Sequence, residues 1–341
     1  MTDTPPDTPT DTAPIAPGFD PRWRDVPDYV LGITREIWEG RDIAALRRYY
    51  AGDLVVRSPA SVVRGNDGIV AATLATLAEF PDRELPGEDV IWCWTDVART
   101  AFLSSHRLLC TATHRGTGLY GAPTGRRLTY RILADCWCRE NRVADEWLVR
   151  DQSAILRQMD ADVVDWTRGL IAREGGPEAC ARPFTPATDI PGPYAGAGDA
   201  DSWGEDLAAS LTALMDADFA VIPRAWDRAA ELAYPGHAVA HGHAGADAFW
   251  LPLRAAFPSA AFTVHTRIGR ADPGQPPRAA LRWSLDGRHD GWGAFGRPTG
   301  AAVHVMGITH VEFGPRGIRR EWTLIDETAV WKQVLLATGA A

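Results

Sequence analysis

The strongest constraint on the fold is an internal repeat. The stretch "GLYGAPTGRR" at residues 118–127 returns 175 residues further along as "GAFGRPTGAA" at residues 293–302. The same residue types flank both copies at the same distances: His114, Glu146, Trp147 and Asp151 around the first, and His289, Glu321, Trp322 and Asp326 around the second. Matches spread over such a distance without a gap predict two similar units in tandem.

A change in composition marks the boundary between the two units. Residues 174–201 are rich in Pro, Gly and Ala and show little periodicity, which is typical of a linker. We therefore expect domains at residues 20–173 and 202–338. Residues 1–19 are rich in Pro, Thr and Asp and lack the basic and apolar regions of a signal peptide, which predicts a disordered tail.

Each unit combines helices with long strands. Apolar residues follow helical spacing over residues 28–50, and a second helix is expected from Asn66 or Asp67 to Pro81. Strand patterns follow at 88–95, 97–113, 127–139 and 142–150, with a tight hairpin turn at 139–142 and a last helix beginning near Ser153. The second copy repeats this order. The pattern predicts an α+β domain in which helices cover one face of a curved, mostly antiparallel sheet.

The repeated stretch itself connects two of these long strands. Its glycines permit backbone angles that other residues resist, and its Pro fixes one φ angle. We interpret it as a recurring turn that sets the curvature of the sheet. The alternative is that its backbone binds a ligand.

Composition excludes several classes of function. A net charge of −9 and the lack of a basic block argue against binding to nucleic acid or to an anionic membrane surface. No apolar run reaches the length of a membrane span. There is no phosphate-cradling loop, nucleophile elbow or HExxH helix. An odd number of cysteines without a CxxC pair indicates reduced thiols and a cytoplasmic protein: Cys93, Cys110, Cys136, Cys138 and Cys180.

The order "GNDG", "EFPD", "ATHRGTGLYGAPTGRR", "ADCWCRENRVADEWLVRD" resembles the SnoaL-like polyketide cyclases, the ester-cyclase branch of the NTF2-like superfamily. The second half is similar to the same family through "GHAG", "AFPS", "GRHDGWGAFGRPTG" and "THVEFGPRGIRREWTLID". The resemblance implies two tandem cone-shaped barrels, each with a deep apolar cavity. It also implies that the two sheets pair within the chain as an intramolecular pseudo-dimer, with further self-association left open.

The same resemblance implies a reaction and a catalytic residue. These cyclases close a ring by an intramolecular aldol reaction without a metal or an organic cofactor, so we expect lyase or isomerase chemistry and no cofactor. An acidic residue on a central strand acts as acid and base, and Asp135 corresponds to it. The second copy carries His310 at that position.

Strand alternation assigns candidate residues to a face. On the strand at 127–138, Asp135 shares a mixed polar face with Arg131, and we expect this face to line the cavity while the apolar face is packed. Asp135 is then either a base with a raised pKa or the ion-pair partner of Arg131. His106 and His114 lie eight residues apart on one strand, and either could orient or protonate a substrate carbonyl.

Aromatic and polar residues around these positions are the expected binding groups. Fourteen tryptophans suit a pocket for flat or polycyclic ligands, or else they fill two cores and an interface. No metal site is expected, because two histidines on one strand rarely chelate an ion alone. The expected substrate-binding residues are Tyr120, Tyr130, Arg131, Trp137, Glu146, Trp147, Asp151, His289, His304, His310, Glu321 and Trp322.

Three functions follow from this reading. The first is a cofactor-independent acid/base enzyme acting on a carbonyl-containing small molecule by aldol-type cyclisation, isomerisation or dehydration. The second is a small-molecule-binding protein without turnover. The third is a structural pseudo-dimer whose second copy is only an interface. Because Asp135 and His310 differ in charge, we expect one copy, the first, to dominate any activity.

Overall fold

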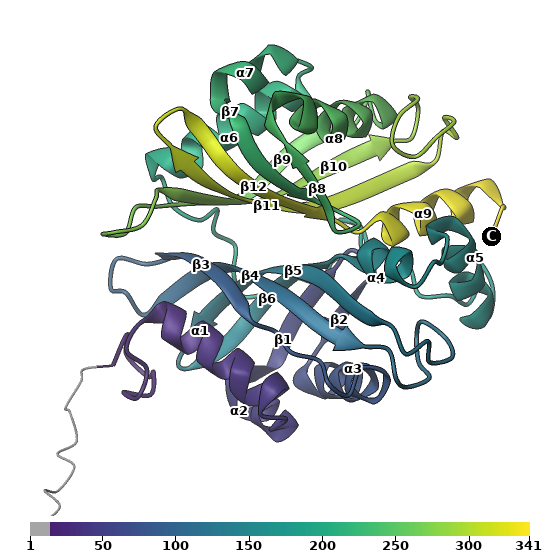
Figure 1. The fold of residues 1–341 in the computed structure, drawn as a ribbon. Helices are drawn as coiled ribbons and strands as arrows, with labels where there is room; N and C mark the ends of the chain where they lie inside the picture. The colour runs from purple at the N-terminus through teal and green to yellow at the C-terminus, as the bar shows by residue number, and fades with distance from the viewer. Residues whose placement is uncertain (1–13) are drawn as a thin grey trace, which may run out of the picture.

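The computed structural model describes residues 14–341 and contains two α+β domains, each built on a six-stranded sheet (Figure 1). The strand orders are β2-β1-β6-β5-β4-β3 and β8-β7-β12-β11-β10-β9, so the two sheets have the same topology. In each sheet one neighbouring pair, β1 with β6 or β7 with β12, is parallel and the others are antiparallel. The expected fold class is confirmed.

The elements of the first domain are α1 (Val26–Thr34), a π-helical turn (Arg35–Glu39), a 3-10 turn (Ile43–Ala45), α2 (Leu46–Tyr49), β1 (Tyr50–Ser58), β2 (Ser61–Arg64), α3 (Asn66–Glu79), β3 (Gly87–Trp94), β4 (Ala101–Thr113), β5 (Arg127–Arg139), β6 (Arg142–Arg150), α4 (Gln152–Gln158) and α5 (Val163–Arg173). Those of the second are α6 (Ser202–Met215), a 3-10 turn (Phe219–Val221), α7 (Ile222–Ala225), β7 (Trp226–Tyr234), β8 (Ala238–His241), α8 (Gly242–Ala256), β9 (Ala261–Arg270), β10 (Arg278–Arg288), β11 (Ala302–Gly314), β12 (Gly317–Ile325) and α9 (Glu327–Thr338).

Local sequence explains most element boundaries. The turn between β5 and β6 has left-handed backbone at Glu140 (φ 49°) and Asn141 (φ 60°), as a two-residue hairpin with the right-handed strand twist requires. Helix α3 ends just before Phe80 and Pro81, as expected. Its N-cap is Gly65 rather than Asn66 or Asp67, because the chain turns there with a φ of 81°.

The expected helix at 28–50 is divided into several shorter pieces. Gly40 and Arg41, the latter with a φ of 58°, separate the π-helical turn from the 3-10 turn. The expected strand at 97–113 begins only at Ala101, because Asp96 accepts hydrogen bonds from the backbone N–H groups of Thr100 and Ala101 and holds a turn.

The described residues before the first domain and those of the linker pack against the domains. The expected disordered tail lies outside the described residues up to position 13, but Ala16 and Phe19 are buried in the first domain's core. Phe19 packs edge-on against Tyr29, with ring centroids 5.1 Å apart. Within the expected linker, Phe184 is buried and Tyr194 stacks on Trp137. The linker therefore packs along the seam between the domains.

The two sheets face each other, and the helices α3 and α8 lie on the outer sides (Figure 1). Equivalent arginines cross this interface in both directions. The Arg107 guanidinium lies 3.5 Å from the ring centroid of Trp322, and that of Arg282 lies 4.0 Å from the ring of Trp147. These positions are related by the 175-residue repeat, so the contact has the self-complementary pattern of a twofold interface.

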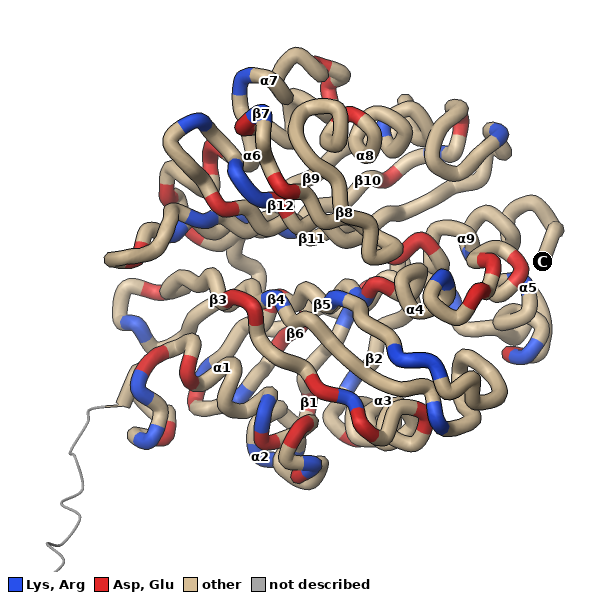
Figure 2. The backbone as a smooth tube through the Cα atoms, in the orientation of Figure 1, with Lys and Arg blue, Asp and Glu red and all other residues tan. Residues whose placement is uncertain are grey.

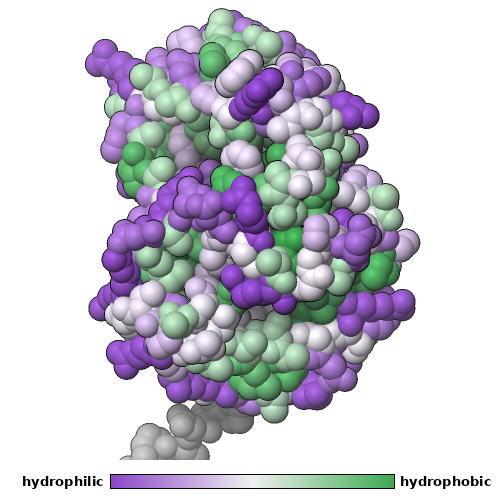
Figure 3. Space-filling view, turned by 90° about the vertical axis from the view of Figure 1, so that its right-hand side faces the viewer, coloured by the Kyte–Doolittle hydropathy of each residue, from purple (hydrophilic) through white to green (hydrophobic). Residues whose placement is uncertain are grey.

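Charged residues of one sign do not dominate either domain. Acidic and basic residues are interspersed over both domains (Figure 2). On the side of the molecule seen in Figure 3, hydrophobic residues form patches that polar residues interrupt. No helix among residues 14–341 is long and apolar enough to cross a membrane.

Candidate active site in the first domain

A cavity of about 620 Å³ lies inside the first domain, between its sheet and the helices α1 and α3. The β5 residues that line it are Ile132, Ala134, Cys136 and Cys138. These belong to the apolar face, so the expectation that the mixed polar face lines the cavity is wrong. The reason is that the second domain covers the polar face, and a sheet buried on both sides does not distinguish its cavity face by polarity.

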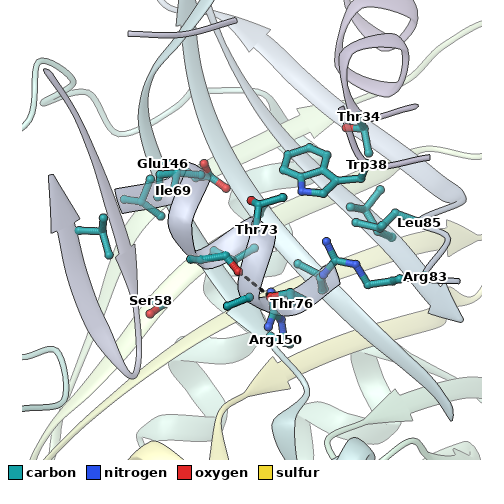
Figure 4. A pocket seen from close by; sticks show the side chains of 18 of the residues that line it. Thr34, Trp38, Ser58, Ile69, Thr73, Thr76, Arg83, Leu85, Glu146 and Arg150 are labelled. Atoms are coloured by element: carbon teal, nitrogen blue, oxygen red, sulfur yellow. Dashed lines mark hydrogen bonds between the residues drawn. The ribbon is translucent and has the colours of Figure 1, made fainter. Parts of the chain in front are cut away.

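Glu146 (Figure 4) is one of the acidic residues that line this cavity, together with Glu79 and Asp326. It lies on β6 opposite Cys136 and is only 7% exposed. Burial raises the pKa of Glu146 to about 7, against a smaller opposing effect of the Tyr50 hydroxyl. A carboxyl group that titrates near neutrality both accepts and returns a proton at physiological pH.

His106 also lines the cavity, from β4. It lies opposite Ala134, which in turn lies opposite Leu148, so about 10 Å of sheet separates the strands of His106 and Glu146. Burial lowers the pKa of His106 to about 4, so its imidazole is neutral at pH 7. Its Nδ1 has no hydrogen-bond partner among residues 14–341. A neutral imidazole offers one N–H to a ligand oxygen.

Two arginines at the cavity were not among the sequence candidates. Arg83, in the turn after α3, is 5% exposed, and Arg150 is the last residue of β6 (Figure 4). The Nε atoms of both are buried without a hydrogen-bond partner within the described chain. Arg150 could have been found from the sequence, because it lies four residues from Glu146 and therefore on the same face of the strand. Arg83 follows no strand pattern and carries no such signal.

Asp135 lies between the two sheets and outside the cavity. Its carboxylate accepts hydrogen bonds from Ser105 Oγ at 2.5 Å and Thr266 Oγ1 at 2.9 Å, and it pairs with Arg282 at 3.3 Å. Burial raises its pKa, while Arg282 opposes the shift. The expected partner Arg131 pairs instead with Glu88. Asp135 is thus a group of the domain interface.

His310, the equivalent of Asp135, reaches the same place from the other domain. Its Nε2 lies 2.8 Å from Ser105 Oγ, and its Nδ1 lies 3.4 Å from Arg107. Burial holds the pKa of His310 well below its ordinary value. The two positions that the repeat aligns therefore meet through Ser105, and neither lines the cavity.

The repeated stretch is tied to helix α3. Glu79 accepts hydrogen bonds from the backbone N–H groups of Leu119 and Tyr120 and lies 3.2 Å from His114 Nε2. A side chain at Gly116 would come within 1.9 Å of the carbonyl oxygen of Ala78, so the loop approaches the helix as closely as glycine allows. The expectation of a turn is met, and His114 anchors that turn.

The remaining sequence candidates divide by location. Tyr120 lines the cavity and stacks on Trp166, and Tyr130 is buried in the core beside it. His289 and Glu321 lie inside the second domain. Asp151 caps α4 and accepts hydrogen bonds from backbone groups of the second domain, and the others lie at the interface or in the packing around it: Arg131, Trp137, Trp147, His304, His310 and Trp322.

The corresponding interior of the second domain is filled by large side chains. By the repeat and the strand registers, Trp250, Tyr234 and Trp283 replace Thr73, Ser58 and Leu108 of the first domain. Trp250 and Trp283 are completely buried. Gly307, where the first domain has Ile132, makes room for Trp283, since a Cβ there would lie 2.3 Å from the indole.

Glu321, the counterpart of Glu146, is satisfied inside this packing. Its carboxylate accepts hydrogen bonds from Trp226, Tyr234, Trp250 and Thr323. The position of His106 is occupied by Leu281, which is buried. The second domain thus keeps the acidic residue but encloses it in the core, and the acid/base arrangement of the first domain is not repeated.

A family model and several solved structures are similar to parts of this chain. The family model described as SnoaL-like polyketide cyclase matches residues 29–159 and, separately, residues 206–334. Similar solved structures include IdmH from Streptomyces antibioticus (23% identity, TM-score 0.35, covering 40% of this chain and 98% of that one). They also include AclR from Streptomyces galilaeus (21%, 0.34, 40% and 96%) and a SnoaL-like polyketide cyclase from Agrobacterium tumefaciens (21%, 0.31, 40% and 99%). A comparison with curated protein sequences finds no match.

The fold and the cavity define a protein of the cone-shaped α+β class, with two such cones in one chain. Within that class, the matched segments cover most of the sequence, and the chain belongs to the SnoaL-like polyketide cyclase family as a tandem pair of family domains.

Proposed function

We propose that the first domain is an acid/base enzyme that moves a proton at a carbon next to a carbonyl group, with Glu146 as the base. The observation that carries this proposal is a carboxyl group with a pKa of about 7 in a buried, largely apolar cavity of about 620 Å³. A base whose pKa lies near the working pH combines a useful ionised fraction with a useful affinity for protons.

The chemistry follows from the charge of each group. The Glu146 carboxylate takes the proton from carbon, and the electron pair of the broken C–H bond moves to the carbonyl oxygen as an enolate. The N–H of neutral His106 supports the charge on that oxygen. In an aldol-type cyclisation the enolate carbon attacks a second carbonyl of the same molecule, and Glu146 returns its proton to the new alkoxide. In an isomerisation Glu146 returns the proton to a different carbon.

One specific observation favours a second candidate function, binding without turnover. Among the cavity residues, the Tyr29 hydroxyl and His106 Nδ1 lack hydrogen-bond partners within residues 14–341. Such groups suit ligand recognition whether or not a reaction follows. The expected lack of a metal or organic cofactor stays a prediction, and activity that survives EDTA and dialysis would support it.

Exchange of α-hydrogen in D₂O tests the proposal without knowledge of the natural substrate. A panel of apolar aryl ketones is incubated with the protein, and deuterium uptake is followed by NMR. We expect catalysed exchange that falls by about 10²–10⁴-fold in Glu146→Gln, the usual contribution of a general base. Asp135→Asn is the matched control at the domain interface and should retain exchange. Binding of the ketones without exchange in the wild type would favour the binding function instead.

A further inference from the structure

Two arginines line the cavity without an ion-pair partner in the described part of the chain. Neither Arg83 nor Arg150 forms an ion pair with any residue at positions 14–341, and both Nε atoms are buried without a hydrogen-bond partner. A buried guanidinium without a counter-charge is costly, because water that would solvate it has been excluded. An anionic group on a ligand would supply the direct ion-pair partner that each of these guanidinium groups lacks.

The two guanidinium groups lie at the same end of the cavity. Both guanidinium groups lie close enough to Cys110 and Tyr130 for their charges to influence these side chains, which lie opposite each other on β4 and β5. Burial raises the pKa of both of these side chains, and the two arginines oppose that shift. Arg150 lies four residues along β6 from Glu146, a distance of roughly 13 Å. The cavity therefore has a cationic end and an acid/base end.

The acidic residues near the cationic end are already engaged. Glu79 holds the repeated loop through three hydrogen-bonding contacts. Asp326, which reaches the cavity from the second domain, uses Oδ1 to cap α9 through Thr328 and Ala329. Burial disfavours the charged form of Arg150, but nearby groups, Asp326 among them, raise its pKa. Within residues 14–341, however, no carboxylate lies at ion-pair distance from either guanidinium group, because Glu79 pairs with His114 and Asp326 caps α9.

The second domain shows that the fold does not require these arginines. The repeat aligns Arg83 with Ala260 and Arg150 with Ile325, and both of these apolar residues are buried. In the second domain large side chains replace the cavity, and the arginines are absent as well. The two arginines therefore occur in the domain that has a cavity, and the fold itself does not require them.

We propose that Arg83 and Arg150 form a recognition site for an anionic group, a carboxylate, on an otherwise apolar ligand. A carboxylate accepts charge-assisted hydrogen bonds from guanidinium groups, which are stronger than bonds between neutral groups. The ligand is elongated, with its carboxylate at the arginines and the remainder extending toward Glu146. This rests on the same cavity as the proposed function and adds the class of its substrate.

A pair of isosteric probes tests the inference by binding alone. Calorimetry with 2-naphthoate and its neutral amide, 2-naphthamide, compares the two ligand charges at constant shape. We expect the carboxylate to bind at least about 10-fold more tightly, the ratio that corresponds to one charge-assisted hydrogen bond. Arg83→Ala and Arg150→Ile, each introducing the residue type of the second domain, should remove most of that preference.

Controls separate recognition from folding and from catalysis. Arg142→Ile, at the exposed start of β6, should keep the preference. Arg150→Ile should melt no lower than the wild type, because Arg150 has no ion-pair partner within residues 14–341 and the second domain buries Ile325 at the aligned position. Glu146→Gln should keep the preference while losing α-hydrogen exchange, so failure of the proposed function is distinguishable. Equal binding of both probes, binding of neither, or a lower melting midpoint of Arg150→Ile would overturn the inference.

Discussion

The proposed role of Glu146 as the base predicts how activity depends on pH. The pKa of Glu146 is raised to about 7, and only its carboxylate form is a base. We therefore expect kcat/KM for α-hydrogen exchange to be low near pH 5, to rise through about pH 7 and to level off above it. A rate profile in the wild type measures this directly. A profile that is flat between pH 5 and 9 would contradict the role of Glu146.

The same pKa makes a prediction about stability. Because the folded pKa exceeds the ordinary value of 4.5, Glu146 favours the folded state below pH 4.5, and this contribution is lost as the pH rises through 7. Glu146→Gln carries no titrating group, so relative to the wild type it should gain about 3 kcal/mol between pH 4 and pH 8. Urea unfolding at both pH values provides the test. A difference between the two proteins that does not change with pH would refute it.

For Asp135 the sequence predicted a buried carboxylate but not its location, which is the domain interface and not the cavity. A carboxylate between apolar neighbours is either functional or paired, and the sequence could not show that its partner, Arg282, lies 147 residues away. We expect Asp135→Asn to retain exchange activity but to lose about 3 kcal/mol of stability, because Arg282 stays buried without its counter-charge. Chemical denaturation alongside the exchange assay measures both, and loss of activity at unchanged stability would restore Asp135 as a catalytic candidate.

Sequence periodicity predicted the bounds of β5 and β6 correctly, but it did not predict which face of the sheet lines the cavity. The bounds of β5 and β6 agree with the expected strands at 127–139 and 142–150, because alternating residues and a turn with left-handed backbone mark them clearly. The faces were inverted. On β5, Asp135 points to the second domain, where it pairs with Arg282, and Trp137 stacks on Tyr194 of the linker. These contacts give the interface the polarity that we expected of a cavity. Alternation fixes which residues share a face but not what covers it.

The loop of the repeated stretch should depend on Glu79. This carboxylate holds Leu119, Tyr120 and His114, and it is buried. Glu79→Ala leaves these donors unsatisfied, so we expect a loss of about 3 kcal/mol and faster amide hydrogen exchange in residues 116–125. Glu79→Gln keeps an acceptor and should lose less. If hydrogen exchange in the loop is the same in all three proteins, Glu79 does not hold it.

The two domains of the molecule share a fold but differ in their interiors, since the first has a cavity and the second is filled by large side chains. The difference lies in a few positions, above all Thr73, which corresponds to Trp250. Thr73→Trp should occupy the cavity, abolish the binding of 2-naphthoate and leave the melting midpoint unchanged or higher, since filling a cavity adds packing contacts. Calorimetry and thermal melting check this. Undiminished binding would show that the ligand site lies elsewhere.

The sequence predicted the tandem architecture because the repeat can be read without a structure. It did not predict the asymmetry, because each Trp that fills the second domain is, in sequence, equally compatible with a pocket wall. Only the structure distinguishes the two, because Trp283 packs against Gly307 and the Trp250 indole donates a hydrogen bond to Glu321.

We propose that the acid/base site lies in the first domain and has no counterpart in the second, and the two aligned acids, Glu146 and Glu321, provide the decisive test of this claim. α-Hydrogen exchange is measured for Glu146→Gln and Glu321→Gln, with the melting midpoint of each recorded so that a folding defect is recognised. Glu321→Gln should melt lower, because Glu321 accepts four hydrogen bonds in the core, but its folded protein should exchange at the wild-type rate. Glu146→Gln should stay folded and lose about 10²–10⁴-fold. Full activity in Glu146→Gln, or loss of activity in folded Glu321→Gln, would contradict the claim.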